Sequence, residues 1–357
     1  MAQFRIAVIS GDGIGNEVVP EGIKVLERIA ETSGGRISFV FESFPWGSAY
    51  YHQHGRMMAE NALSALQRFD AIYFGAVGWP DVPDHVSLWG LRLAICQGFD
   101  QYVCLRPVRL LPGIASPLRD TNAERIDFVV VRENTEGEYA GVGGRRGSGD
   151  SEIALQTAVF TARGCERIIR YAFDLAMIRQ KRKVTSVTKS NAQQYGMTLW
   201  DEVFRRVAAE YPQVTTEQWL VDAMAARFVL RPETLDVVVG SNLFGDILSD
   251  LGSALAGSLG VAASANIDPE RRMPSMFEPV HGSAPDIAGQ GIANPIGQIW
   301  SAALMLDHLG LPDEARRIVA AIEYTTANGI TTPDLGGSCT TAEAGDAIAD
   351  ALHQGPS

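Results

Sequence analysis

Apolar runs typical of strands alternate along the chain with segments whose apolar positions recur at helical spacing. The short runs predict strands at residues 5–10, 39–44, 71–75, 126–132, 183–188 and 235–240. The periodic segments predict helices at residues 18–32, 59–67, 161–179, 193–211, 247–257, 295–309, 312–328 and 342–353. This alternation predicts an α/β fold around a largely parallel sheet.

Two glycine-rich segments interrupt the pattern. Gly11-Asp-Gly-Ile-Gly15 follows the first strand with the spacing G-x-G-x-G, whereas a dinucleotide fingerprint needs G-x-G-x-x-G. We therefore expect a tight strand-to-helix turn there. Residues 141–149 contain five glycines and lead into residues 151–160, whose alternation suits an exposed strand. We expect a flexible loop, which either lies on the surface or belongs to an arm that adds strands to a second subunit.

Composition limits the class of protein. The 357 residues are 46% hydrophobic and 20% charged, which suits one large domain or two ordinary ones. A net charge of −12 argues against nucleic acid or an anionic membrane as the main partner. No apolar run approaches the ~20 residues that span a bilayer, and the N-terminus lacks the features of a signal peptide. The four scattered cysteines favour a reducing, cytoplasmic location.

One segment carries two closely spaced acids. Asn242-Leu-Phe-Gly-Asp-Ile-Leu-Ser-Asp250 follows the apolar run Val237–Val239. On a helix, Asp246 and Asp250 would lie on one face and repel each other. A divalent cation such as Mg²⁺ would reverse that repulsion, since it binds carboxylate oxygens. The other interpretation is a helical first turn whose acids match the helix dipole, and spacing alone leaves both open.

Four further polar segments accompany the aspartate pair. They are Arg132-Glu-Asn-Thr-Glu-Gly-Glu-Tyr139, Thr188-Lys-Ser-Asn191, Val221-Asp-Ala-Met-Ala225, and Glu278-Pro-Val-His-Gly-Ser-Ala-Pro-Asp-Ile287 with Asn294-Pro295. The first two and the aspartate pair follow predicted strands, where α/β folds build their sites. Alone, each segment has an ordinary interpretation, such as a surface lysine or a helix cap.

Together these segments resemble the β-decarboxylating 2-hydroxyacid dehydrogenases, a family that includes isocitrate, isopropylmalate, tartrate and D-malate dehydrogenases. The resemblance runs from Gly11 to about Gly336. Ser87-Leu-Trp-Gly90, Phe99-Asp-Gln-Tyr102 and residues 292–301 are most similar to the tartrate/D-malate branch. The resemblance implies a two-domain α/β fold of the isocitrate/isopropylmalate dehydrogenase type, not a Rossmann fold.

The resemblance also implies how the chain is organised. Residues 1–104 plus 259–357 would form a discontinuous cofactor-binding domain. Residues 105–258 would form the dimerisation and metal/substrate domain, with a clasp arm at about 140–162. The expected partners are a small dicarboxylate substrate and a second copy of the chain, in a homodimer with a shared active site. Whether dimers pair into tetramers is left open.

Catalytic roles follow from the same resemblance. Asp246 and Asp250, with Asp222 from the partner subunit, would hold Mn²⁺ or Mg²⁺ as Lewis acid and template. Lys189, also from the partner, would take the hydroxyl proton, because a nearby cation lowers the pKa of a lysine. Tyr139 would protonate the enol formed when CO₂ is lost.

Substrate and cofactor contacts are implied as well. Arg106 and Arg132 match two arginines that bind substrate carboxylates, for which guanidinium is well shaped. The cofactor loop would comprise His281, Gly282, Ser283, Ala284, Asp286, Ile287 and Asn294. Asp286 suits ribose hydroxyls and would repel a 2′-phosphate, so NAD⁺ is the expected cofactor. A K⁺ requirement is left open.

The chain departs from the family at one substrate arginine. The position ten residues before Arg106 holds Cys96, and Cys104 stands where asparagine is common. Arg92 lies one helical turn before Cys96, where relatives place a specificity residue. Either Arg92 replaces the missing guanidinium, or the site binds its substrate weakly, since a charge-assisted bond is worth roughly 1.5–3 kcal/mol.

The sequence therefore predicts an NAD- and divalent-metal-dependent oxidation, with decarboxylation, of tartrate or D-malate. One alternative is a 3-isopropylmalate dehydrogenase, against which a charged Arg92 argues. An alternative of another class is a non-catalytic homologue that binds ligand without turnover.

Overall fold

The computed structural model describes residues 2–119 and 121–353, which divide into two compact units. The first unit comprises Met1–Gln101, Arg109–Ala123 and Ser253–Ser357. The second comprises Tyr102–Val108 and Glu124–Gly252. Both units are α/β, as the alternating pattern predicts. Among the described helices, none is long and apolar enough to cross a membrane.

The first unit contains five strands in the spatial order β2-β1-β3-β12-β11. Their bounds are β1 Ala2–Gly11, β2 Ile37–Ser43, β3 Ala71–Ala76, β11 Ala263–Ile267 and β12 Ser275–Pro279. Parallel pairing joins β2, β1, β3 and β12, whereas β11 runs antiparallel to β12. The helices are α1 Gly15–Thr32, α2 Ser48–His54, α3 Ala62–Leu66, α4 Asp84–Ser87, α5 Leu93–Gly98, α10 Ile296–His308, α11 Pro312–Ala327 and α12 Thr341–Ala351.

Strand β3 is buried on both faces, because helices cover each side of it. All six of its residues are buried. The Tyr73 hydroxyl donates a 2.6 Å hydrogen bond to the Gln298 carbonyl on α10. The neighbouring Ile72 and Phe74 point to the opposite face, where they join an apolar cluster with residues of α3 and α5. A strand covered on both faces has apolar residues at successive positions, so β3 could be predicted from the sequence.

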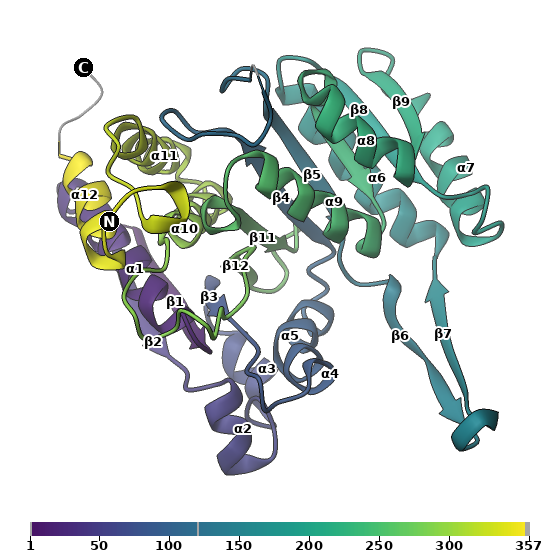
Figure 1. Ribbon diagram of the computed structural model, residues 1–357, viewed down its shortest axis with the longest axis horizontal. Coiled ribbons are helices and arrows are strands. Elements are labelled where there is room, and N and C mark those ends of the chain that lie inside the picture. The colour runs from purple at the N-terminus through teal and green to yellow at the C-terminus, as the bar shows by residue number, and fades with distance from the viewer. Residues whose placement is uncertain (1, 120, 354–357) are drawn as a thin grey trace. The chain divides into compact units, whose positions relative to one another are not determined.

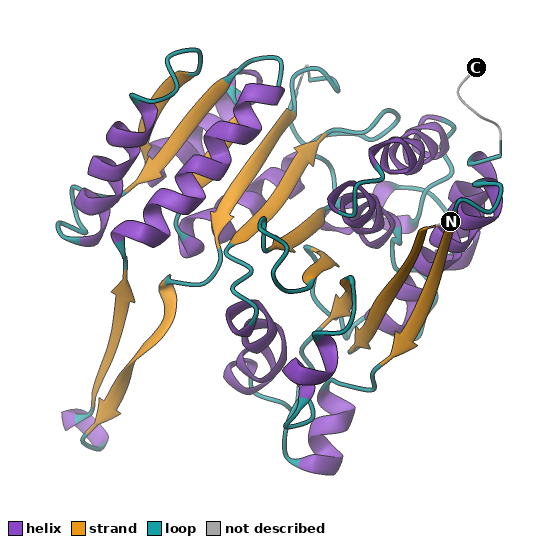
Figure 2. Cartoon of the chain, turned by 180° about the vertical axis from the view of Figure 1, so that it is seen from behind, coloured by secondary structure: helices purple, strands orange, loops and turns teal. Residues whose placement is uncertain are grey.

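The second unit contains a sheet in the order β4-β5-β10-β8-β9. The strands are β4 Val103–Arg109, β5 Asp127–Glu133, β8 Lys183–Thr188, β9 Thr215–Leu220 and β10 Val237–Gly240. The helices are α6 Ala162–Ile178, α7 Gly196–Ala208, α8 Val221–Leu230 and α9 Asn242–Leu255. In Figure 1, α8 and α9 lie in front of these strands, and Figure 2 shows α6 and α7 on the other face.

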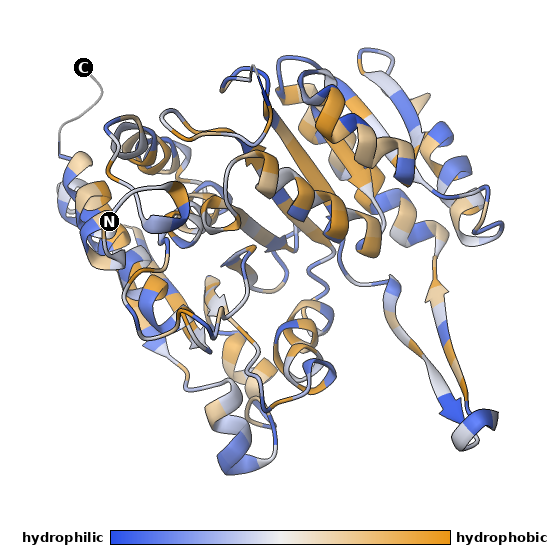
Figure 3. Ribbon diagram, viewed as in Figure 1, coloured by the Kyte–Doolittle hydropathy of each residue, from blue (hydrophilic) through white to orange (hydrophobic). Residues whose placement is uncertain are grey.

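Valines form the centre of this second sheet. Val237, Val238 and Val239 of β10 lie beside Val129, Val130 and Val131 of β5 in parallel register. β-Branched side chains favour strands, and here they are buried beneath helices on both faces. Figure 3 shows these strands coloured mostly hydrophobic.

A two-stranded antiparallel arm projects from the second unit (Figure 1). It consists of β6 Gly137–Arg146 and β7 Ile153–Val159. The expectation of a flexible loop at residues 141–149 is therefore wrong for most of that segment. Its glycines lie in β6, where the pairing register shifts between Gly137 and Val142. Missing side chains weaken the strand pattern in the sequence, although the backbone still pairs.

The other predicted strands and helices are present with shifted boundaries. Strand β8 has the predicted bounds, and α1 follows the predicted tight turn at Gly11 to Gly15. Helix α9 begins at Asn242, five residues before the predicted start. Strands β4, β9, β11 and β12 and helices α2, α4, α5 and α8 have no counterpart among the predicted elements.

Candidate active site

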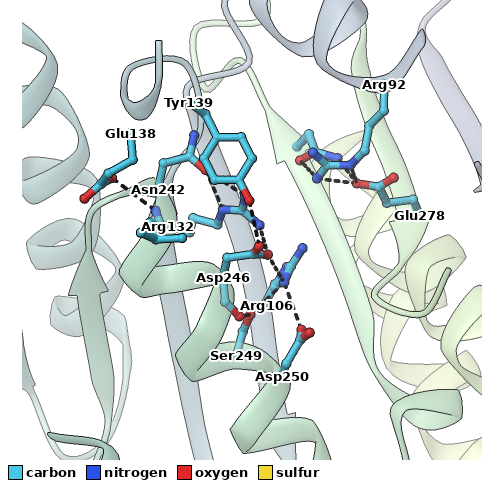
Figure 4. A network of polar contacts seen from close by, with 12 residues as sticks. Arg92, Arg106, Arg132, Glu138, Tyr139, Asn242, Asp246, Ser249, Asp250 and Glu278 are labelled. Carbon is cyan, nitrogen blue, oxygen red and sulfur yellow. Dashed lines mark hydrogen bonds and ion pairs between the residues drawn. The ribbon is translucent and has the colours of Figure 1, made fainter. Parts of the chain in front are cut away.

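The site in the second unit is organised around Asp246 on α9 (Figure 4). Arg132, at the end of β5, forms an ion pair with the Asp246 carboxylate through Nη1. Its Nε and Nη2 donate hydrogen bonds of 3.0 and 2.6 Å to Asn242 Oδ1. Arg132 is 2% exposed and Asn242 is fully buried. The guanidinium orientation is therefore fixed by two residues that lie one turn apart at the start of α9.

A second arginine reaches the same helix from β4. Arg106 Nη1 lies 2.7 Å from Ser249 Oγ, 3.2 Å from Asp246 Oδ1 and 3.4 Å from Asp250 Oδ1. One guanidinium thus touches both carboxylates of the pair, which lie one helical turn apart on α9. This agrees with the predicted common face, and it places two cations against two anions.

Tyr139 from β6 completes the cluster. Its hydroxyl donates a 3.2 Å hydrogen bond to Asp246 Oδ2. The Arg132 guanidinium carbon lies 5.4 Å from the centre of the Tyr139 ring, a cation–π distance. The phenol is therefore held beside the carboxylate by residues from two other elements.

The start of α9 is stabilised by a residue distant in sequence. Glu138 on β6 accepts hydrogen bonds from the Leu243 backbone N–H at 3.2 Å and from Ser241 Oγ at 3.1 Å. A carboxylate at this end of a helix satisfies a free N–H and matches the dipole. Gly245 allows the close approach of β5, because a Cβ there would lie 2.6 Å from Arg132 Cβ.

The carboxylates could also serve as metal ligands. Burial raises the pKa of Asp250, with Arg106 opposing that effect, so a further cation would favour the charged form. Two carboxylates on one helix face offer the hard oxygen ligands that Mg²⁺ and Mn²⁺ bind. Within the described ranges, no three His, Cys, Asp or Glu residues are gathered as a metal-binding group. A third acidic ligand would have to come from elsewhere.

Lys189 and Asp222 form a separate pair within the second unit. Lys189 Nζ, just beyond β8, lies 2.5 Å from Asp222 Oδ1 in the first turn of α8. The hydrogen bond from Lys189 lowers the pKa of Asp222. The structure thus brings these two predicted residues together, but it does not gather Asp222 with Asp246 and Asp250 into one acidic group.

In the first unit, Arg92 is held by buried polar partners. Its Nη2 lies 2.7 Å from Glu278 Oε1 and 3.2 Å from Asn266 Oδ1. One turn later, Cys96 is fully buried in the apolar cluster that also contains Phe99 and Met276. An arginine at position 96 would therefore have to replace a small apolar side chain in a packed core. All four cysteines are described, and none forms a disulfide.

The predicted cofactor loop, His281–Ile287 with Asn294, also lies in the first unit. Asp286 is exposed, and among the described residues only its carbonyl is bonded, to Gln290 Nε2 at 2.8 Å. Burial lowers the pKa of His281, whose Nδ1 lies 2.9 Å from the Gly282 carbonyl. Asn294 is engaged within the fold, since its Nδ2 donates to Asp334 at 3.0 Å and its Oδ1 accepts from the Ile296 N–H at 3.0 Å.

Three residues of the aspartate site were not predicted from the sequence. They are Glu138, Asn242 and Ser249, which hold the helix start, Arg132 and Arg106 respectively. Glu138 lies inside the Arg132–Tyr139 motif, and the other two lie inside Asn242–Asp250. Their positions within the motifs were the available signal, but their partners depend on how β4, β5 and β6 meet α9.

Comparison with known proteins places this site in a family. The isocitrate/isopropylmalate dehydrogenase profile matches residues 5–348. A probable tartrate dehydrogenase/decarboxylase of Agrobacterium vitis is 56% identical over 353 residues, covering 99% of this chain and 98% of its own. The D-malate dehydrogenase (decarboxylating) of Escherichia coli K12 is 55% identical over 356 residues, covering 98% of both chains.

A solved structure agrees with these relatives. The crystal structure of isocitrate dehydrogenase from Methylococcus capsulatus superposes with a TM-score of 0.88 at 37% identity, covering 98% of this chain and 100% of that one. Sequence and fold therefore point to the same group of proteins. The chain belongs to the isocitrate/isopropylmalate dehydrogenase family and is one of its enzymes.

Proposed function

We propose that this enzyme is an NAD⁺-dependent, Mn²⁺- or Mg²⁺-dependent dehydrogenase of tartrate or D-malate. The observation that carries the proposal is the convergence of Arg106, Arg132 and Tyr139 on the Asp246 carboxylate. Buried guanidinium groups suit a small dicarboxylate, and carboxylates on one helix face suit a divalent cation. The names of the relatives supply the candidate substrates.

The residues divide the reaction between them. For D-malate, the C2 hydroxyl would lose its proton to Lys189, and NAD⁺, when bound, would supply the acceptor for the C2 hydride, so that the substrate becomes a keto acid. The carboxylate β to the new carbonyl leaves as CO₂, and Tyr139 delivers a proton to the carbon left behind. Arg106 and Arg132 hold the substrate carboxylates in place throughout.

Different residues would hold the divalent ion and the cofactor. Asp246 and Asp250 would hold the divalent ion, with Asp222 of the partner subunit as the third acid. The ion supplies Lewis-acid stabilisation of the negative charge that develops when CO₂ leaves. Asp286 would accept hydrogen bonds from the adenosine ribose of NAD⁺, and its charge would repel the phosphate of NADP⁺.

Two features of the second unit support the proposed homodimer. Lys189 pairs with Asp222, and the aspartate pair contacts Arg106, so one chain holds two separate parts of the proposed site. The arm β6–β7 also exposes large apolar side chains, with Ile153 at 60% and Leu155 at 68% exposure. Exposed apolar surface of this kind suits a second copy of the chain.

Initial rates of NADH formation test the activity. The purified protein is assayed with Mn²⁺ and NAD⁺ or NADP⁺, against D-malate, the tartrate isomers, isocitrate and 3-isopropylmalate. We expect NADH with D-malate or a tartrate, and release of CO₂ with D-malate. Higher kcat/KM on 3-isopropylmalate would instead identify that dehydrogenase. Absence of NADH with every acid, while the protein binds one of them, would identify a non-catalytic homologue.

Sedimentation analysis tests the shared site. Replacing Leu155 by Lys puts a charge on the exposed face of the arm, and we expect monomers with little activity. A matched control replaces Ile178, an apolar residue at 83% exposure at the end of α6, by Lys, and should leave the mass unchanged. A fully active monomer would contradict the shared site.

A further inference from the structure

Glu17 in the first turn of α1 holds a segment more than 270 residues away in the sequence. Its Oε1 accepts the Gly289 backbone N–H at 2.7 Å, and its Oε2 accepts the Gly291 N–H at 2.8 Å. A carboxylate that accepts two N–H groups forms charge-assisted hydrogen bonds, which are stronger than neutral ones. Its negative charge also lies at the positive end of the α1 dipole.

The two glycines present their N–H groups through an unusual backbone. Gly289 has φ +80° and Gly291 has φ +67°, in the left-handed region that glycine adopts without strain. The loop therefore turns twice within three residues, and both turns meet the same carboxylate. The loop has hydrogen bonds of its own, from the Gln290 N–H to the Ile287 carbonyl at 3.2 Å and from Gln290 Nε2 to the Asp286 carbonyl at 2.8 Å, and Glu17 adds two further bonds from outside the loop.

The turn that precedes Glu17 supports the other end of the loop. The Ile14 N–H donates to the Ser283 carbonyl at 2.9 Å, and Gly13 leaves no room there for a Cβ, which would lie 2.0 Å from that oxygen. Asp12, 5% exposed, accepts from Ser48 N and Oγ, each at 2.7 Å. Asp12, Gly13 and Ile14, just before α1, are thus held in place by contacts with Ser48 and Ser283.

Helix α12 contacts the same segment from its own first turn. The Thr341 N–H donates to the Gly291 carbonyl at 2.8 Å, and Thr341 Oγ1 donates to the Ala293 carbonyl at 2.7 Å. Ala293 also packs with Ile14 and Val18 in a small apolar cluster. Side chains from the first turns of α1 and α12 therefore restrain the loop between Gly289 and Ala293.

We infer that Glu17 is a positioning residue for the cofactor: it holds the loop of residues 281–294 in the shape that receives NAD⁺, with Thr341 as a second restraint. The inference rests on the proposed use of NAD⁺. Asp286 lies between Ser283, which bonds to Ile14, and Gly289, which bonds to Glu17. The chain on both sides of Asp286 is therefore attached to the start of α1. The Asp286 carboxylate can then bind NAD⁺ without further ordering of the loop, which lowers the loss of conformational entropy on binding.

Hydrogen exchange and calorimetry on the full-length protein test this inference. In Glu17→Gln, the side-chain oxygen can accept a hydrogen bond from only one of the two N–H groups of Gly289 and Gly291. The NH₂ group then faces the second N–H, so one hydrogen bond is lost. We expect exchange at Gly289 and Gly291 to become about tenfold faster without any cofactor, as for the loss of one charge-assisted bond. By titration calorimetry, the Kd for NAD⁺ should rise by about tenfold. Glu27→Gln, at an exposed position on the same helix, is the matched control.

Four results separate the possibilities. Faster exchange with a raised Kd for NAD⁺ and a nearly unchanged kcat supports the inference. Unchanged exchange in Glu17→Gln overturns it, and faster exchange with an unchanged Kd removes its link to the cofactor. If the unmodified protein does not bind NAD⁺, the proposed cofactor is wrong, and exchange alone still decides whether Glu17 holds the loop.

Thr341 provides an independent check that does not alter charge. Thr341→Val removes the bond to the Ala293 carbonyl, whereas Thr341→Ser retains a hydroxyl. We expect a raised Kd for NAD⁺ in the valine variant and recovery in the serine variant. Equal affinities in the two variants would show that this restraint is not used.

Discussion

Replacing Asn242 by Ala should both destabilise the second unit and weaken substrate binding. Asn242 Oδ1 accepts two hydrogen bonds from the buried Arg132 guanidinium, at 3.0 and 2.6 Å. Hydrogen bonds to charged groups contribute about 1.5–3 kcal/mol each, and a buried donor left without a partner adds its own cost. Since the two donors belong to one guanidinium, we expect a total loss of about 3 kcal/mol.

Two measurements check this prediction. Urea unfolding followed by tryptophan fluorescence gives the change in stability, and initial rates give kcat/KM for the preferred dicarboxylate. We expect a drop of about a hundredfold in kcat/KM if the full 3 kcal/mol reaches the transition state. Asn242→Asp retains an oxygen acceptor for Arg132, so it should remain stable, but its charge offsets that of Arg132 and should raise KM.

A matched control sets the baseline. Asn328, exposed at the end of α11, donates to the Tyr324 carbonyl at 2.8 Å, and Asn328→Ala should change stability by less than about 0.5 kcal/mol. If Asn242→Ala behaves like Asn328→Ala in both measurements, Asn242 does not orient Arg132, and our reasoning about this site is refuted.

Three further changes probe the second unit. Gly245→Ala places a methyl group 2.6 Å from Arg132 Cβ, so the free energy of unfolding should fall by roughly 1–3 kcal/mol and the melting temperature should fall with it. An unchanged melting temperature would mean that α9 shifts freely to make room for the methyl group. Burial raises the pKa of Glu133 to about 7 from its usual 4.5, because the folded protein favours the protonated carboxyl. The contribution of Glu133 to the free energy of unfolding is therefore full below pH 4.5 and is lost as pH rises through 7. That amounts to a stability difference on the order of 3 kcal/mol between the two ends of this range, and Glu133→Gln should flatten the dependence of the urea midpoint on pH. Mn²⁺ at about a hundred times its Kd should stabilise the protein by about 2.7 kcal/mol, and Asp246→Asn or Asp250→Asn should abolish the shift in melting temperature.

Elements covered on both faces could be predicted from the sequence, and elements with buried polar pairs could not. Strands β3 and β10 are apolar runs in the sequence and strands in the structure. Strands β11 and β12 were missed because they carry Asn266 and Glu278. These side chains are buried together with Asn266 Nδ2 2.6 Å from Glu278 Oε1, and Arg92 adds a third partner. A polar residue in the sequence gives no sign of whether such a partner exists.

The candidate site shows the same division. Spacing predicted that Asp246 and Asp250 share a helix face, and both contact Arg106 from α9. The early start of α9 could not be predicted, because Glu138 satisfies the Leu243 N–H from a different strand. Local patterns describe a helix only as far as its own residues stabilise it.

The alternation of strands and helices, the acidic pair on one helix and the family to which the motifs belong are all readable from the amino-acid sequence. These properties depend on residue type and spacing along the chain, which folding does not alter. By contrast, the contacts by which Asn242 orients Arg132, Cys96 packs in an apolar core and Glu17 holds a loop near residue 290 are visible only in the folded protein. Such contacts join residues far apart in the chain, and their energies depend on distances that exist only after the chain has folded.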